Sequence, residues 1–478
     1  MDKFFNFYRK MSLPKKATLW YTFSNILQKG IGFFVVPFYI RCLSATEYGQ
    51  VMIFLSWREI ISIFATLNLF SGVFTKAMVD YDQDRDRYTS CMQGLSSIIT
   101  LVLFFLYLPA RSLWNNILEM DSITVILLFL YFLTSPSVSF WSVRQRVENK
   151  YKQMVALTIA KALCVPITCI MLILYTNWRA NAMIWGILIV EICFGTWFYV
   201  YQFIKGRCFY HRSYWVHALL FNLPLIPHYL SLIILSQVDR ILIGNICGKD
   251  KSGIYSLACQ ITSLMNVIIS AINGALVPWL YQKYKTKEYS IVKDVTNRLC
   301  VIMGLITFIL MLIAPDIVSI IGTKEYTNAI WLIPPIALGM YFTFCYGFFA
   351  SVSFYYSATK YVMIATTSGA CLSILLNLIF LPKFGFLSAG YTSLLCYFFF
   401  LLMHYMYMTK VCKNNTNGDK IFDVRFIKIN CLILLGVMLL VLFLYCFSFL
   451  VRYLFLFISF ILLLKKRNVL STISIIKI

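Results

Sequence analysis

Charged side chains occur deep inside long apolar stretches of this sequence, at Lys29, Arg58, Glu59, Lys161 and Glu191. A charge at the centre of a membrane helix costs about 2.5–3.5 kcal/mol, so such side chains should face protein or water. A cation in such a place can attract an anionic ligand, and a carboxylate can bind and release a proton. These five residues are therefore the first candidates for a functional site.

The first of these cations belongs to a polar stripe. Asn25, Lys29 and Gly32 are spaced at i, i+4 and i+7, so they share one face of a helix. Such a stripe is expected where a helix lines a cavity. The alternative is that Lys29 forms a structural ion pair with a carboxylate on a neighbouring helix.

The other four charges allow two interpretations. Arg58 and Glu59 are adjacent, so their side chains leave the helix about 100° apart and are not expected to pair. Arg58 could contact an anionic ligand while Glu59 binds a coupling proton, or each could satisfy a partner inside the bundle. Lys161 could extend to the cytoplasmic surface, whereas Glu191 is central and is a candidate for ion coupling.

Prolines interrupt the apolar stretch at residues 216–243. Asn222, Pro224, Pro227 and His228 occur within seven residues, and proline frees backbone carbonyls that need another partner in a membrane. We expect a kink that can bend, with His228 at the break. A static kink with a hydrogen-bonded histidine is the alternative.

Polar residues also occur near the outer end of this stretch and in the next one. Asp239 and Arg240 lie nearer the outer surface and could fix the outer hairpin or contribute to the site. Asn266, Ser270 and Asn273 share a helix face. That face could line a cavity or join neighbouring helices through hydrogen bonds.

The elements that must position these residues are membrane-spanning helices. Of 478 residues, 60% are hydrophobic and 13% are charged, which is about half the charged share of soluble domains. A bilayer span needs about 20 mostly apolar residues, and such stretches recur almost end to end. The sequence predicts an all-α polytopic membrane protein with about 14 transmembrane helices, at residues 18–40, 48–72, 91–108, 122–141, 154–175, 182–204, 216–243, 253–279, 299–321, 331–355, 361–381, 387–408, 426–446 and 450–464.

Lysine and arginine predict the orientation of these helices. The net charge is +23, and cytoplasmic loops of membrane proteins collect Lys and Arg. With the N-terminus inside, roughly 30 of these residues fall in cytoplasmic loops and about 8 outside. The bias holds to the tail Lys465-Lys466-Arg467, which predicts both termini in the cytoplasm. The basic charge therefore indicates membrane topology and not nucleic-acid binding.

Enzymatic and metal-dependent classes are disfavoured. No segment outside the predicted spans exceeds about 20 residues, which is too short for a soluble catalytic domain, and no G-x-x-x-x-G-K-[ST] phosphate loop occurs. The 15 cysteines form no C-x-x-C pair and no zinc-ligand spacing. Asp80, Asp82, Asp84 and Asp86 could bind a cation, although a solvated loop is favoured. We expect no enzyme, no cofactor and no metal site.

A short internal repeat in the sequence suggests two related halves. The segments Leu43-Ser-Ala-Thr-Glu47-Tyr48-Gly49 and Gly248-Lys-Asp-Lys-Ser-Gly253-Ile-Tyr255 are both short outer hairpins, six predicted helices apart. An even offset preserves orientation, so the halves would be parallel repeats. The predicted domains are a six-helix bundle at 1–215, a second at 216–410, and two additional helices with a cytoplasmic tail at 411–478.

Four motifs resemble those of bacterial polysaccharide exporters, the O-antigen flippase type of the multidrug/oligosaccharidyl-lipid/polysaccharide exporter superfamily. The resemblance covers about residues 15–410, and the last two helices add little. The motifs are Pro37 with Leu43-Ser-x-x-Glu47-Tyr48-Gly49; Leu223-Pro224-Leu225-Ile226-Pro227-His228 with Asp239-Arg240-x-x-Ile243; Gly253-Ile-Tyr255-Ser-Leu-Ala258 through Asn266 to Val277-Pro278; and Asn377-x-x-x-Leu381-Pro382-Lys383-Phe384-Gly385 with Ala389-Gly390-Tyr391.

The resemblance implies two six-helix bundles that face each other across a central cavity. It also implies a substrate, a polyprenyl-diphosphate-linked oligosaccharide such as an O-antigen or related lipopolysaccharide repeat unit. This substrate would move from the inner to the outer leaflet of the bacterial cell inner membrane. Polysaccharide polymerase and chain-length proteins are the expected protein partners.

Moving such a molecule requires a polar path, because an unpaired hydroxyl in hydrocarbon costs about 2–7 kcal/mol. We expect alternating access through a water-filled, cationic lumen, with an ion gradient as the energy source if the step is driven. The candidate substrate-binding residues of the cavity are Lys29, Arg58, Asn25, His228, Lys161 and Arg240. The candidates for ion coupling are Glu59, Glu191 and Asp239.

Two rival functions remain open. A drug/cation antiporter of the same superfamily would need an acidic, aromatic-lined cavity, which Lys29 and Arg58 disfavour. A membrane polymerase or glycosyltransferase acting on lipid-linked sugars usually needs a sizeable outer loop or a cytoplasmic domain. The predicted outer loops are all short.

Overall fold

The computed structural model describes residues 11–416, 418–447 and 449–455, which fold into helices joined by turns, without a strand. Eleven helical segments in this part of the chain are long and apolar enough to cross a membrane. The prediction of an all-α polytopic membrane protein is thus confirmed. The chain divides into two compact units, Met1–Gly244 (unit 1) and Asn245–Ile478 (unit 2).

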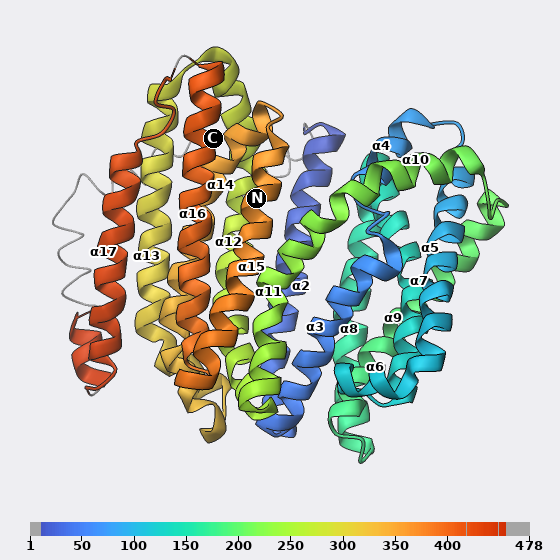
Figure 1. The fold of residues 1–478 in the computed structure, drawn as a ribbon, viewed down its shortest axis with the longest axis horizontal. Coiled ribbons are helices and arrows are strands. Elements are labelled where there is room, and N and C mark those ends of the chain that lie inside the picture. The colour runs from blue at the N-terminus through green and yellow to red at the C-terminus, as the bar shows by residue number, and fades with distance from the viewer. Residues whose placement is uncertain (1–10, 417, 448, 456–478) are drawn as a thin grey trace, which may run out of the picture. The chain divides into compact units, whose positions relative to one another are not determined.

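Unit 1 combines long helices with short ones that lie where the chain turns or breaks (Figure 1). The long helices are α2 (Leu13–Cys42), α3 (Ala45–Thr66), α5 (Arg85–Tyr107), α7 (Ser122–Val147), α8 (Tyr151–Tyr175), α9 (Ala180–Gly206) and α11 (Ile226–Cys247). The short ones are α4 (Val73–Asp80), η1 (Leu108–Ala110), α6 (Arg111–Leu118), α10 (Arg212–Asn222) and η2 (Leu223–Leu225).

Two long helices, α2 and α3, are not among the eleven apolar segments. They have 30 and 22 residues, so they are about 45 and 33 Å long at 1.5 Å per residue, enough to cross a hydrocarbon core of about 30 Å. They hold Lys29, Arg58 and Glu59 in their interiors. Together with the helix that begins at residue 449, they agree with the predicted total of about 14 spans.

Two spans of unit 1 are broken, and hydrogen bonds link one break to the other. α3 ends at Thr66, where Leu67 and Asn68 adopt positive φ angles of 47° and 50°, so the predicted span 48–72 stops early. The predicted kink in span 216–243 is confirmed as η2, between α10 and α11. The buried Asn222 amide donates to the carbonyls of Leu67 and Asn68 at 3.1 Å each. Asn222 thereby binds the turn that follows α3, in which the Asn68 carbonyl also accepts the Ser71 N–H at 2.9 Å.

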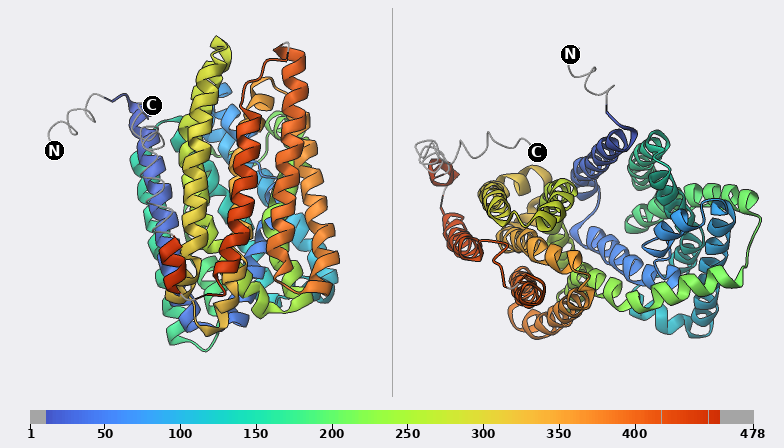
Figure 2. Two further views of the ribbon diagram at one scale, coloured as in Figure 1. Left: turned by 90° about the vertical axis from the view of Figure 1, so that its left-hand side faces the viewer. Right: turned by 90° about the horizontal axis from the view of Figure 1, so that it is seen from above.

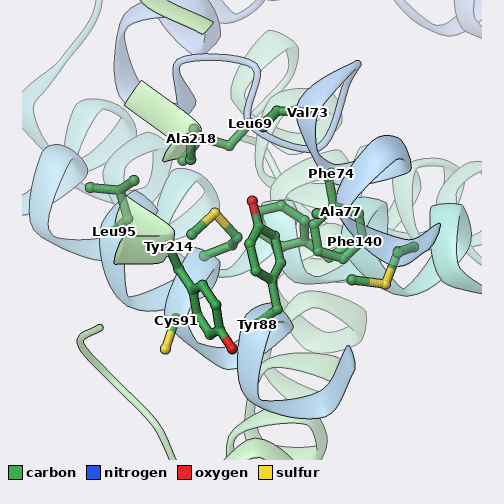
Figure 3. Packing of buried hydrophobic residues seen from close by; sticks show 12 residues of the cluster. Leu69, Val73, Phe74, Ala77, Tyr88, Cys91, Leu95, Phe140, Tyr214 and Ala218 are labelled. Carbon is green, nitrogen blue, oxygen red and sulfur yellow. The ribbon is translucent and has the colours of Figure 1, made fainter. Parts of the chain in front are cut away.

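An aromatic core holds the short helices α4 and α10 in place (Figure 3). Phe74 of α4 packs on Phe140 of α7 with ring centroids 4.7 Å apart. Tyr88 of α5 packs on Tyr214 of α10 at 5.0 Å. Helices of 8 and 11 residues are not stable alone in water, so this packing is what keeps both broken spans in register.

Unit 2 is a set of long helices that run side by side (Figures 1 and 2). They are α12 (Lys249–Thr286), α13 (Tyr289–Ile321), α14 (Ile333–Tyr355), α15 (Thr359–Phe384), α16 (Ser388–Asn415) and α17 (Val424–Leu444), with the 3-10 segment η3 (Lys324–Trp331) before α14. α14 is the most enclosed of these helices, with 78% of its apolar 18-residue stretch buried.

Small and polar residues allow the helices of unit 2 to approach closely. A Cβ at Gly339 of α14 would lie 2.8 Å from Tyr397 Cδ2 of α16, so this contact requires glycine. Thr392 of α16 donates to Asn377 Oδ1 of α15 at 3.1 Å. Asn377, which the sequence analysis quotes as part of a motif, therefore joins two helices.

Some predictions on organisation stay predictions. The division at Gly244 separates compact units, whereas the predicted boundaries at 215 and 410 follow an expected repeat that the division does not test. The predicted last helix at 450–464 is described as helical only to residue 455. The basic tail at 465–467 lies outside the described residues.

Candidate functional site

Four helices of unit 1 bring charged and aromatic side chains together midway along their lengths. Arg58 is the fourteenth of 22 residues in α3, and Tyr131 is the tenth of 26 in α7. Lys161 is the eleventh of 25 in α8, and Glu191 is the twelfth of 27 in α9. These four residues and Glu59 form the unit 1 charge network.

The expectation that Arg58 and Glu59 do not pair was wrong. Arg58 Nη2 donates to Glu59 Oε1 at 2.7 Å. Their Cβ atoms leave the helix in different directions, but the long guanidinium side chain folds back to reach the neighbouring carboxylate. The side chains are 18% and 41% exposed, so Arg58 is enclosed while Glu59 remains accessible.

The alternative that Lys161 extends to the cytoplasmic surface does not hold in the structure. Lys161 Nζ donates to Glu191 Oε2 at 2.7 Å, and the two side chains are 19% and 20% exposed. A carboxylate on the facing helix stabilises the ammonium group inside the membrane, so the lysine has no need to reach the headgroups. The sequence identified both charges but not their pairing, because they are 30 positions apart.

Tyr131 connects the two ion pairs. The guanidinium carbon of Arg58 lies 5.5 Å from the centroid of the Tyr131 ring, which is a cation–π distance. Tyr131 also interacts electrostatically with Glu59 and Glu191. Glu191 in turn interacts with Arg58. The two pairs therefore belong to one electrostatic unit.

The unit 1 charge network has no net charge, which determines how it would meet an anionic ligand. It contains two cations and two carboxylates, so their charges balance. An anionic ligand that binds Arg58 or Lys161 competes with the carboxylate already there. A carboxylate displaced in this way would need a proton or another partner, because an unpaired charge inside a membrane is costly.

The polar stripe of α2 faces away from that helix's exposed apolar side. Asn25 and Lys29 are exposed, and no ion pair or hydrogen bond to another described residue holds Lys29. At 3.6 residues per turn, the apolar side lies roughly 160° around the helix from the stripe. The exposed apolar side chains include Phe23, Ile26, Phe34 and Phe38. Lys29 is therefore not on the face suited to lipid.

Residues of α11 attach to α3 within one turn of Arg58 along the helix, although residues two apart in a helix do not share a face. Arg240 Nη1 donates to Gln237 Oε1 at 2.5 Å, and the same oxygen accepts a hydrogen bond from Ser56 at 3.2 Å. Ser56 is two residues before Arg58 in the sequence. Asp239, a predicted coupling residue, is only 5% exposed. His228 is half-buried next to Tyr229, with ring centroids 5.9 Å apart.

Two residues of this site were missed from the sequence. Tyr131 is not among the predicted site residues, although its place in mid-span, away from the interfaces where membrane tyrosines gather, was an available signal. Gln237 is also absent from the prediction, because no neighbouring residue in the sequence indicates that its side-chain oxygen links Arg240 to α3. Both act through contacts between helices, which one sequence does not reveal.

The acidic loop after α4 serves packing. Asp84 accepts a hydrogen bond from Tyr214 Oη at 2.9 Å, and Asp86 pairs with Arg144. Within the described ranges, no three His, Cys, Asp or Glu residues are placed to hold a metal ion.

Comparison with protein families gives two matches. Residues 15–284 match the family described as polysaccharide biosynthesis protein, and residues 224–379 match the MatE family. An uncharacterized membrane protein of Haemophilus influenzae is 24% identical over 389 residues, 78% of this chain and 90% of that protein. The Lsg locus putative protein 1 of the same organism is 33% identical over 79 residues, 16% of this chain and 20% of that protein.

Solved structures with a similar fold are transporters. The lipid II flippase MurJ in an inward closed conformation has a TM-score of 0.66 and 17% identity, and the match covers 95% of this chain and all of that one. An inward-facing multidrug resistance MATE family transporter has a TM-score of 0.61 and 14% identity, with 81% and 96% covered. At these identities the likeness establishes the fold.

Proposed function

This chain belongs to the polysaccharide biosynthesis protein family, and on that premise we propose that it is a flippase. The proposed substrate is an oligosaccharide linked to a polyprenyl diphosphate. It would move from the inner to the outer leaflet of the bacterial cytoplasmic membrane by alternating access. An O-antigen or related repeat unit is the proposed oligosaccharide, with both termini of the protein in the cytoplasm.

The observation that carries this proposal is the charge network in the middle of unit 1. A sugar chain on a diphosphate brings many hydroxyls and roughly two negative charges, and each unpaired hydroxyl in hydrocarbon costs about 2–7 kcal/mol. Arg58 and Lys161 place cationic groups at mid-span, where these costs are greatest. Their partial exposure of 18% and 19% leaves them within reach of a ligand.

Charge balance suggests how transport is driven. A diphosphate that engages Arg58 and Lys161 takes them from Glu59 and Glu191, the carboxylates to which they are bonded at 2.7 Å. Protons on these two carboxylates would restore neutrality. We therefore propose that the substrate and protons bind and cross together, so that a proton gradient drives the step only when it is directed the same way as the substrate. Asp239, which is buried, is a further candidate for the proton.

Residues outside the network complete the proposed path. Lys29 and Asn25 present a polar stripe on α2 opposite its apolar side, and we propose that they contact sugar or phosphate. His228 follows the break between α10 and α11, where a change of helix angle would move it. Arg240, bonded to Gln237, is proposed to transmit that movement to α3.

The match of residues 224–379 to the MatE family favours a second candidate, a drug/cation antiporter. The accessible carboxylate of Glu59, 41% exposed, could bind a cationic drug. The two functions differ in what removal of positive charge does. An antiporter for cations would tolerate or benefit from loss of Arg58, whereas an exporter of an anionic lipid would not.

Complementation tests the proposal. In a strain lacking this gene, Arg58→Gln with Lys161→Gln should reduce surface polysaccharide by about 30-fold, since losing a partner of a buried charge contact costs at least about 2 kcal/mol. Lys76→Gln is the matched control, because Lys76 is an exposed cation of the same unit. Immunoblots of membranes establish that each variant inserts. Normal polysaccharide from the double variant at normal protein level would refute the proposal, and drug resistance without a glycan defect would establish the antiporter.

A further inference from the structure

A basic cavity opens at the end of unit 2, beside the loop that joins α16 to α17. Its volume is about 930 Å³. Two carboxylates, Asp419 and Asp423, contribute to its lining, and they are outnumbered by cations. The cationic residues that line it are Lys293, Lys413, Lys420, Arg425 and Lys428.

The positive charge of this cavity is not neutralised by ion pairs. Within the described part of the chain, none of the five cations forms a salt bridge. The Lys428 ammonium lies 5.1 Å from the centroid of the Tyr405 ring, which leaves its charge free for an anion. The Asp423 carboxylate is occupied at the start of α17, where it accepts the Phe426 N–H at 3.0 Å. An excess of positive charge therefore remains to bind a ligand.

The cavity is preformed because the loop beneath it is anchored. Ile421 and Phe422 are only 1% and 2% exposed, although they belong to a connecting segment. The Phe422 ring packs against Phe348 and Phe349, with centroids 5.9 Å apart in each case. This anchoring gives the cavity an apolar floor beneath a cationic rim, so little ordering is needed on binding.

An exposed apolar track leads from the cavity along α17. Ile429 lines the cavity and is 45% exposed. Leu432 and Ile433 follow at 68% and 57% exposure and continue into the apolar run that ends at Leu444. A ligand whose charged group binds in the cavity can thus extend a hydrocarbon chain along the helix. A free anion would gain nothing from this track.

We propose that this cavity binds the phosphate of a lipid headgroup, with the lipid's hydrocarbon chain along α17. Clusters of Lys and Arg at the cytoplasmic ends of membrane helices attract anionic headgroups, and the predicted topology places this loop on that side. The site is separate from the charge network of unit 1 and does not depend on the flippase proposal. The bound lipid is an anionic phospholipid or a polyprenyl diphosphate, since both carry a phosphate headgroup on a hydrocarbon chain.

Binding to the purified full-length protein in neutral detergent tests the site. The probes are phosphatidylglycerol, a polyprenyl diphosphate, phosphatidylcholine and inorganic phosphate, with bound lipid counted by native mass spectrometry. Each cation near a charged surface contributes about fivefold to affinity, so K413Q/K420Q/R425Q should bind the anionic lipid about 100-fold more weakly. The matched control is K285Q/K287Q/K360Q, which removes three exposed cations outside the cavity.

The outcomes separate the ligand sources. If the K413Q/K420Q/R425Q variant loses only phosphatidylglycerol binding, the site is assigned to a bulk phospholipid. If it loses only binding of the polyprenyl diphosphate, the site is assigned to a lipid-linked carrier. Equal loss in the control, retention of anionic lipid by the cavity variant, or binding of inorganic phosphate as tight as that of the lipids would overturn the proposal. The charge-preserving K413R/K420R/R425K variant should bind as the wild type does, which guards against misfolding of the glutamine variant.

Discussion

Arg58 and Glu59 form an ion pair in the middle of α3 although their side chains start in different directions. Lys161 and Glu191 form a second pair across α8 and α9. Each pair accounts for how a charged residue persists in a membrane segment, since the partner offsets the cost of leaving water. Pairing also sets the response to a ligand, because an anion must replace a carboxylate rather than fill an empty site.

The Lys161–Glu191 pair makes a prediction about stability at the scale of single residues. Lys161→Met leaves Glu191 without its partner, and breaking a buried pair costs about 3–5 kcal/mol. The 20% exposure of Glu191 lets solvent reduce this to about 1–3 kcal/mol. The Lys161→Met, Glu191→Leu double variant should recover most of the loss, because neither charge remains. Thermal unfolding midpoints of the four proteins in detergent measure the coupling, and additive losses would contradict the pairing.

At the scale of elements, the breaks in two spans are the feature that shapes unit 1. The prolines at 224 and 227 allowed the break between α10 and α11 to be predicted. The end of α3 at Thr66 could not be, because no proline or glycine marks it and the turn that follows is bonded by a distant residue, Asn222. Sequence thus located the helices from their apolar runs, whereas a break stabilised by a tertiary contact required the structure.

The candidate site shows the same division. Charges deep in apolar runs marked Arg58 and Glu191 as internal residues, which their ion pairs agree with, since the cost of burying charge is visible in one sequence. For Lys161, which pairs with Glu191, the sequence also allowed a place at the surface. Which charges meet depends on how α3, α7, α8 and α9 pack. Tyr131, the residue that joins both pairs, was therefore absent from the predicted site.

The polar stripe of α2 makes an element-scale prediction about access to water. In a background with the exposed Cys193, Cys371 and Cys446 changed to serine, Lys29→Cys should react with a charged, water-soluble thiol reagent in intact membranes. Phe34→Cys, on the apolar side of the same helix, is the control and should stay unmodified, because lipid excludes the reagent. Equal labelling of both positions, or labelling of Phe34→Cys alone, would show that Lys29 does not face an aqueous path.

At the scale of the whole molecule, the chain has the fold seen in the lipid II flippase MurJ and in a multidrug resistance MATE family transporter. Composition alone indicated a polytopic membrane protein, and the motifs indicated the family that the match to residues 15–284 confirms. The substrate and the direction of movement are the proposals that go beyond this, and they depend on the charge network rather than on the fold.

The most direct test is the rate at which a fluorescent polyprenyl-diphosphate oligosaccharide changes leaflets in proteoliposomes that contain the purified protein. The wild type should move it faster when a proton gradient directed the same way as the lipid is imposed. Arg58→Gln with Lys161→Gln should lower that rate by about 30-fold, while Lys76→Gln leaves it unchanged. A double variant that moves the labelled lipid as fast as the wild type would contradict the central claim that these cations carry the anionic headgroup through the membrane.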